Sequence, residues 1–212
     1  MKKLKTLLFA STLLVGFSSV AMAQSSDNET ISANATVVQG MVVGGDTNDI
    51  EFNNILLNST KFIDATDGSV DAEARTVGNV DGITGGEERG WFDISIAGGI
   101  NVDVSLNITT QLKDENNNSL GFSTSEKGFG YKELNGMLTE TKPTGTTPIT
   151  AIDGGEGTKF SFLETTWTLD NAFTMPESGT VYLALGGETF ALTDQVLGTY
   201  SGDLTLTATV VD

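Results

Sequence analysis

Apolar and polar residues alternate at every second position along much of this chain. The pattern is clearest over residues 101–110, where valine, leucine and isoleucine occupy positions 102, 104, 106 and 108 between polar neighbours. Successive side chains of a β-strand point to opposite faces, so the pattern predicts a strand with one buried and one solvated face. Residues 204–210 repeat it. Shorter or weaker alternation predicts further strands, about eight or nine in all, at 31–37, 50–57, 92–96, 160–162, 165–169 and 181–185.

Clusters of glycine, aspartate and asparagine separate these stretches. Such residues favour tight turns because they tolerate left-handed backbone angles or hydrogen-bond to the neighbouring backbone. No window of a dozen residues beyond the N-terminus has helical spacing with a capping residue, and parallel strands would need crossovers. We therefore expect an all-β, antiparallel sandwich or barrel. The expected turns are 44–46, 67–68, 81–82, 98–99, 114–118, 153–155 and 186–187.

Residues 125–158 interrupt the alternation with glycines, prolines and a threonine-rich run. We interpret this stretch as an insertion between core strands. Long connections in compact domains are usually functional or disordered. We favour a third interpretation, in which the loop folds onto its own small cluster of Phe129, Tyr131, Leu134 and Met137.

The first 23 residues have a pattern of their own. Lysines at positions 2, 3 and 5 precede an apolar run over 6–20 and the small-residue sequence Ala21-Met22-Ala23. This order is typical of a secretory signal peptide, which we expect to be cleaved after Ala23. The run is shorter than the roughly 20 residues that span a bilayer, and no later segment reaches that length without charges. We expect an exported periplasmic, cell-surface or extracellular protein, with 24–212 as one domain and no membrane span.

Acidic residues dominate the charge. The whole chain has a formal net charge of −17, and loss of residues 1–23 removes three lysines and no acid, which leaves eight basic and 28 acidic side chains and a charge of −20. Nucleic-acid affinity depends on clustered lysine and arginine, so nucleic acid is a poor candidate partner. Cations or cationic surfaces remain compatible with this charge.

The absence of histidine and cysteine removes most familiar catalytic designs. Serine triads, cysteine nucleophiles, the common zinc sites and haem ligation through histidine all need one of them. Carboxylate pairs remain, and Glu87 with Glu88 or Asp153 with Glu156 are the candidates. Adjacent acids on a strand point to opposite faces, and such pairs arise by chance in an acidic chain. We expect no enzyme and no catalytic residue.

Metal and phosphate sites find equally little support. Residues 114–118 begin like a calcium loop, but Ser119 stands at the sixth position in place of glycine and Ser125 at the twelfth in place of glutamate. We interpret this stretch as a polar hairpin turn, and 64–71 and 44–49 likewise. The run Gly154-Gly155-Glu156-Gly157 lacks the lysine and hydroxyl residue of a phosphate loop. We therefore expect no cofactor or metal.

Residues 197–210, with Gly198-Thr199-Tyr200-Ser201-Gly202 before the last alternating strand, are similar to the closing signature of a bacterial family of exported β-domains, domain of unknown function 4402. Residues 50–55 and 91–99 agree with it in order. The resemblance implies an immunoglobulin-like or pilin-like sandwich, similar to spore-coat-U proteins, at the cell surface or in the periplasm, without catalytic residues to carry over. The longer stretch 125–158 departs from the family. On physical grounds Tyr200 marks a structural corner, packing its ring and satisfying its hydroxyl.

Three functions follow from these observations. We expect first a structural or adhesive surface protein, with a fimbria-like fibre subunit that binds its own copies as one form of it. Residues 31–37 offer a strand for a neighbour's sheet, although their small alanines favour pairing within the same chain. The alternative is a carbohydrate- or ligand-binding module that stacks Trp91, Trp167 or Tyr131 on a surface glycan, with Trp91 on the face opposite Phe92. The third, an enzyme, would need a deep pocket lined by paired acids.

Overall fold

The computed structural model describes residues 26–30, 36–38, 41–74, 86–124, 133–152 and 159–211. The regular structure in these ranges consists of β-strands, and every strand pair among them is antiparallel. The prediction of an all-β, antiparallel fold is confirmed. The strands form three sheets.

The first sheet is centred on the two strands with the longest alternation. Its order is β1-β16-β7-β12-β11, and β13 also pairs with β7. β16 pairs with β7 along their whole length, from Leu204 opposite Ile108 to Val211 opposite Asn101. The bounds are β1 (Ser26–Thr30), β7 (Asn101–Ile108), β11 (Phe160–Leu163), β12 (Thr166–Leu169), β13 (Phe173–Thr174) and β16 (Leu204–Val211).

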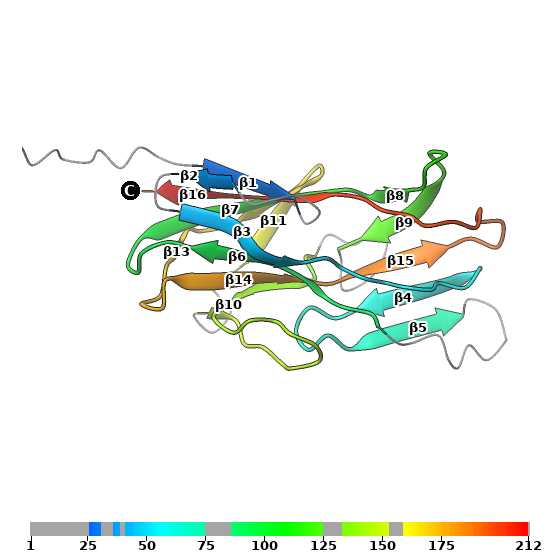
Figure 1. Ribbon diagram of the computed structural model, residues 1–212, viewed down its shortest axis with the longest axis horizontal. Coiled ribbons are helices and arrows are strands. Elements are labelled where there is room, and N and C mark those ends of the chain that lie inside the picture. The colour runs from blue at the N-terminus through cyan, green and yellow to red at the C-terminus, as the bar shows by residue number, and fades with distance from the viewer. Residues whose placement is uncertain are drawn as a thin grey trace, which may run out of the picture.

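The second sheet lies against the first in a sandwich (Figure 1). Its order is β10-β14-β6-β3-β2. Apolar side chains of both sheets fill the space between them, and those of Phe92, Leu183 and Leu206 are fully buried. Burial of each such side chain stabilises the fold by about 1.5–3 kcal/mol. The bounds are β2 (Thr36–Val38), β3 (Met41–Asn48), β6 (Gly90–Ser95), β10 (Gly136–Thr139) and β14 (Thr180–Leu185).

The third sheet extends the molecule along its long axis, beyond one end of the sandwich (Figure 1). Its order is β5-β4-β15-β9-β8. Ile63 and Phe122 of this sheet belong to the same hydrophobic cluster as the sandwich core. The bounds are β4 (Ser59–Ile63), β5 (Val70–Ala74), β8 (Gln111–Lys113), β9 (Ser119–Ser123) and β15 (Gly187–Ala191).

The third sheet was mostly missed by the alternation pattern, because its strands are short and polar. β4 reads Ser-Thr-Lys-Phe-Ile and places a lysine at a buried position. The predicted strand 50–57 is wrong: this segment is a loop whose only ladder contact in the described structure is an isolated bridge between Glu51 and Glu88. Of the predicted strand 31–37, residues 36 and 37 lie in β2, and 31–35 lie outside the described residues.

The expected turns have mixed outcomes. Those at 67–68, 98–99 and 114–118 are confirmed, whereas 81–82 and 153–155 lie outside the described residues. The turn at 44–46 is wrong, because these residues continue β3 through a shift of register between Val43 and Thr47. Gly44, with φ of 69°, absorbs the irregularity. The turn at 186–187 is also wrong, because Gly186 passes the chain directly from β14 to β15, and these strands follow one another along the long axis (Figure 1).

The stretch 125–158 is part of the sandwich where the structure describes it. Residues 136–139 form β10 at the edge of the second sheet, and the side chain of Leu138 is fully buried in the common core. The described part of this stretch therefore packs on the common core and not on a separate cluster. A strand of only four residues offers too few alternating positions to be recognised. Phe129 and Tyr131 lie outside the described residues.

Residues 140–150 form a strap over the outer face of the second sheet. Pro143 and Ile149 are buried, and the Ile149 amide donates to the Thr66 carbonyl at 2.9 Å. Lys142 of the strap lies over the ring of Trp91, which is buried although it points away from the core. Among the described residues, no helix has the length and apolar character needed to cross a membrane.

Gly186 gives the first prediction. A Cβ atom at this position would lie 2.1 Å from the Ile63 carbonyl oxygen and 2.8 Å from the Ala65 amide nitrogen. We expect Gly186→Ala to lower the free energy of unfolding by about 3 kcal/mol, because the two sheets must separate to admit the methyl group. Gly198→Ala is the control, since its nearest neighbour would be 3.6 Å away. Equal urea midpoints for the two variants would contradict this account of the junction.

Candidate functional site

A cleft of about 570 Å³ lies over the inner face of the third sheet. Two segments far apart in sequence, residues 49–57 and 195–204, form its walls, and we call it the loop cleft. Its apolar floor comes from strands β8, β9, β15 and β16, through Leu112, Leu120, Phe122, Ala191 and Leu204. It is thus a site that only the folded chain assembles.

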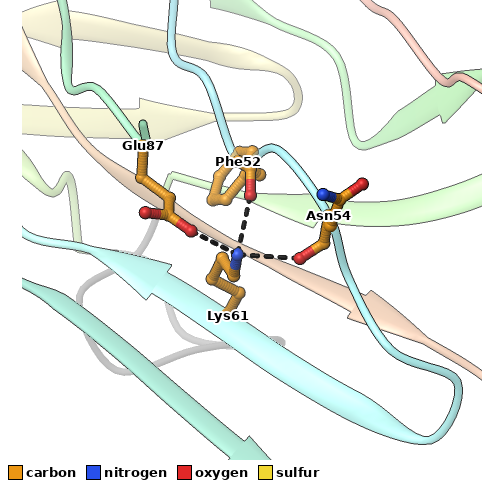
Figure 2. Close-up of polar contacts among 4 residues, drawn as sticks. All are labelled: Phe52, Asn54, Lys61 and Glu87. Carbon is orange, nitrogen blue, oxygen red and sulfur yellow. Dashed lines mark hydrogen bonds and ion pairs between the residues drawn. The ribbon is translucent and has the colours of Figure 1, made fainter. Parts of the chain in front are cut away.

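The first wall is held by a buried lysine (Figure 2). Lys61 Nζ donates to the carbonyl oxygens of Phe52 at 2.9 Å and Asn54 at 2.8 Å, and lies 2.5 Å from Glu87 Oε1. Only 3% of either charged side chain is exposed. A buried ammonium is tolerated only when a counter-charge and hydrogen-bond acceptors replace water. Lys61 therefore joins the loop 49–57, strand β4 and Glu87 through a single ammonium group.

Aromatic packing completes the first wall. The ring of Phe52 meets that of Phe122 edge to face, with centroids 6.0 Å apart and an interplanar angle of 75°. Only 7% of Phe52 is exposed. Edge-to-face pairs favour this geometry because the positive ring edge contacts the negative face. The loop thereby covers part of the inner face of the third sheet.

The second wall is organised by Tyr200 and Gln195. The Tyr200 hydroxyl donates to the Val196 carbonyl at 2.6 Å and accepts from Gln195 Nε2 at 2.8 Å. Gln195 Nε2 also donates to the Ser119 carbonyl at 2.9 Å. Tyr200 thus satisfies its hydroxyl within the loop, as expected of a structural corner. The bend before β16 is further anchored by two backbone hydrogen bonds between Ser201 and Lys113.

The rim of the loop cleft combines acidic and apolar groups. Asp49, Glu51 and Asp203 line it, and burial raises the pKa of Asp49 above its usual range. None of the described lining residues is basic. Leu197, at 82% exposure, and Val196 project from the second wall. The rim therefore suits a ligand that is partly apolar and uncharged or cationic.

The tryptophans do not form the expected sugar-stacking surfaces. Trp91 lies on the face opposite Phe92 but is 5% exposed, with Tyr182 against its edge and Lys142 Nζ 4.6 Å from a ring centroid. Trp167 is 2% exposed and donates from Nε1 to Thr124 Oγ1 at 3.1 Å. The expectation that either ring is open to a glycan is wrong. Tyr182 and Lys142 contact the ring of Trp91, and Phe162 packs against that of Trp167.

Lys142 is held over Trp91 by an ion pair with Asp46. The hydrogen bond to Asp46 is the main reason why the pKa of Lys142 is raised. The amide of Asp46 in turn donates to Asp93 Oδ1 at 2.8 Å. This chain of contacts attaches the strap to β3 and β6. It supports a structural role for the charged groups around Trp91.

Of the two candidate carboxylate pairs, the structure describes only Glu87 and Glu88, and it does not bring their side chains together. Glu87 is buried against Lys61, whereas Glu88 is exposed and accepts a hydrogen bond from Asn48 Nδ2 at 3.0 Å. Asp153 and Glu156, with the glycine run around them, lie outside the described residues. Within the described ranges, no three acidic side chains are grouped closely enough to hold a metal ion.

The calcium-like stretch 114–118 is the turn between β8 and β9. The Asp114 carboxylate accepts hydrogen bonds from the amides of Asn116 and Asn118 and from Asn118 Nδ2. These donors, led by the Asn118 side chain, lower the pKa of Asp114. The interpretation as a polar hairpin turn is confirmed. In 64–71 the carboxylates of Asp64 and Asp67 likewise accept amide hydrogen bonds two residues on, whereas 44–49 belongs mainly to β3.

Sequence reasoning overlooked the loop cleft. It depends on Lys61, a lysine at an inward position of β4 between Ser59 and Ile63, and this placement was the one available signal. No family model matches the chain, and neither a curated protein nor a solved structure is significantly similar to it.

The ion pair of Lys61 gives the second prediction. Lys61→Met removes the counter-charge of a buried carboxylate, so we expect the free energy of unfolding to fall by about 3–5 kcal/mol. Adding Glu87→Gln to this variant neutralises the stranded charge and should restore part of the loss. Chemical denaturation of the single and double variants measures both effects. A double variant less stable than Lys61→Met would show that Glu87 is stabilised by groups other than Lys61.

The cover over Trp91 gives the third prediction. We expect Lys142→Ala to increase acrylamide quenching of tryptophan fluorescence, because the lysine stem and ammonium shield the ring from solvent. Lys159→Ala, which removes an exposed lysine before β11, should leave quenching unchanged. Identical quenching in the two variants would show that Lys142 does not cover Trp91 in solution.

Proposed function

We propose that this chain is an exported, non-enzymatic structural or adhesive surface protein. The proposal depends on the difference between the two ends of the molecule along its long axis. Strands β1 and β2 and the end of β16 lie at one end, whereas the third sheet and its loops lie at the other (Figure 1). A protein anchored or assembled through its terminal strands would present the third sheet to its surroundings.

Exposed apolar side chains gather at the far end of the third sheet. Leu56 and Leu57 precede Asn58, whose amide donates to the carbonyl of Leu192 at 3.3 Å. Val196 and Leu197 follow in the next loop, and all five apolar side chains are at least 40% exposed. Single exposed leucines are common, but a group of them indicates a contact surface. This grouping supports a binding end on the third sheet.

The terminal strands offer a route to assembly. β1 pairs only with β16 at the edge of the first sheet, and β2 only with β3 at the edge of the second, among the described residues. Within the chain, both described N-terminal strands occupy sheet edges. Edge strands can be exchanged between copies because the backbone ladder is the same in either arrangement. This supports a fimbria-like fibre subunit as one form of the proposal.

The remaining support comes from the sequence. Residues 1–23 carry the order of a signal peptide, and residues 197–210, which resemble the family of domain of unknown function 4402, form the bend before β16 and most of that strand. A periplasmic, cell-surface or extracellular location is part of the proposal. The lack of histidine and cysteine and the engagement of Glu87 by Lys61 support a non-enzymatic function.

An extracellular ligand-binding module is the second candidate function. The loop cleft favours it, because a cavity of about 570 Å³ lies within the range of about 300–1,000 Å³ that small ligands occupy. The tryptophans no longer contribute to this candidate, since both are buried.

Comparison of residues 24–212 with residues 39–212 tests assembly through the terminal strands. We expect the longer form to give ordered oligomers or filaments in size-exclusion chromatography and negative-stain micrographs, because exchanged strands link successive copies. The shorter form should not assemble. A longer form that stays a compact monomer at every concentration would rule out the fibre subunit. Recovery of the protein from the cytoplasm with residues 1–23 intact would overturn the proposal of export.

A further inference from the structure

The two walls of the loop cleft contain backbone amides that are not paired with other described backbone groups, although the carbonyls of Asn54, Leu56 and Val196 already accept side-chain hydrogen bonds. Residues 54–57 and 196–200 lie outside the strands, and their amide groups donate no hydrogen bond to any other described backbone group. Backbone N–H groups in folded proteins are nearly always paired with protein or water. A second polypeptide in extended conformation is a ligand that pairs such groups along a whole segment.

The walls are held open in this state by side chains. Lys61 takes the carbonyl groups of Phe52 and Asn54, so the first wall cannot collapse onto the second without uncovering a buried charge. Tyr200 and Gln195 fix the second wall by hydrogen bonds within the loop and to Ser119. Preorganised walls lower the ordering cost of binding.

The same contacts argue against a sugar ligand. Carbohydrate sites use free polar side chains and an exposed aromatic face, but Gln195 and Tyr200 are occupied by each other and by the backbone. The Thr109 hydroxyl donates to the Gln111 carbonyl at 2.7 Å. What the cleft presents instead is backbone, an apolar floor and exposed side chains such as those of Leu57 and Leu197.

The acidic charge of the cleft restricts which peptides it can bind. Asp49 and Glu51 line the cleft, and no described lining residue is basic. The chain's own segment 24–30 contains Asp27 and Glu29 and no basic residue, so it would be repelled. An occupant with lysine or arginine between apolar residues matches both the acidic rim and the leucines. Alternation of this kind places the two kinds of side chain on opposite faces of an extended strand.

We propose that the loop cleft binds an extended segment of another protein, in which basic and apolar residues alternate, by strand addition to residues 54–57 or 196–200. Apolar side chains of the segment contact Leu57 and Leu197, and its basic side chains face Asp49 and Glu51. The inference rests on the proposed adhesive function only for its biological setting, because it names the partner that the third sheet would contact.

Fluorescence anisotropy of purified residues 24–212 with a labelled eight-residue peptide of alternating lysine and valine tests this site. We expect saturable binding that Leu197→Asp weakens about tenfold or more, through loss of an apolar contact. Because this substitution adds an acid, binding driven by net charge alone would instead grow stronger. Leu163→Asp is the matched control: Leu163 is 75% exposed on the β11–β12 hairpin, outside the cleft, and its loss should leave affinity unchanged.

Two altered peptides separate backbone pairing from charge. A peptide with glutamate in place of lysine should not bind, and one with alternate N-methylated amides should lose binding because it cannot complete a ladder. Absence of saturable binding, equal binding of the N-methylated peptide, or no effect of Leu197→Asp would overturn the proposal. Failure of assembly or export would leave these results intact, so the inference and the proposed function fail separately.

Discussion

Burial of the Lys61 ammonium in the inner face of the third sheet requires that water be replaced by other acceptors. Two carbonyl groups of the loop 49–57 and the carboxylate of Glu87 supply them. The loop therefore cannot leave the sheet without exposing a charge pair, and the position of the cleft wall follows from this one requirement. The cost of desolvating the pair is offset only while all three contacts persist.

A second buried cation also donates hydrogen bonds to loop carbonyls, at the place where the strap meets the sandwich. Arg89 is 2% exposed, and its guanidinium donates to the carbonyls of Ala65 at 2.9 Å and Thr147 at 2.5 Å. Burial is the main reason why the pKa of Arg89 is lowered. Loops that cover a sheet carry backbone carbonyls with no ladder to join, and long cationic side chains satisfy several of them at once. Lys61 and Arg89 thus satisfy backbone carbonyls of the covering loops, as strand pairing satisfies those of the sheets.

Strands could be predicted from the sequence where they are long and have one solvent-exposed face, because many alternating positions then show the pattern. β7 and β16 alternate over eight residues each and were predicted nearly to their ends. β4 and β10 are short, and a buried lysine in one and a glycine in the other obscure the pattern. The strand expected at 50–57 is a loop instead, because Phe52 packs onto a sheet that the sequence had not revealed. The cleft was beyond prediction because its walls are about 140 residues apart and meet only through that sheet.

The way in which the third sheet joins the sandwich bears on the binding role proposed for that end of the molecule. Among the connections that the structure describes throughout, the chain passes between the two parts from β3 to β4, from β7 to β8, from β14 to β15 and from β15 to β16. At β14–β15 the connection is a single residue, Gly186, and the hydrophobic cluster continues across the junction through Ile63 and Phe122. A part linked by several connections and a shared core cannot swing as a domain on one linker would. A partner bound at the loop cleft would therefore be held by the third sheet and the sandwich as one body, which is what the proposed adhesive or structural function requires.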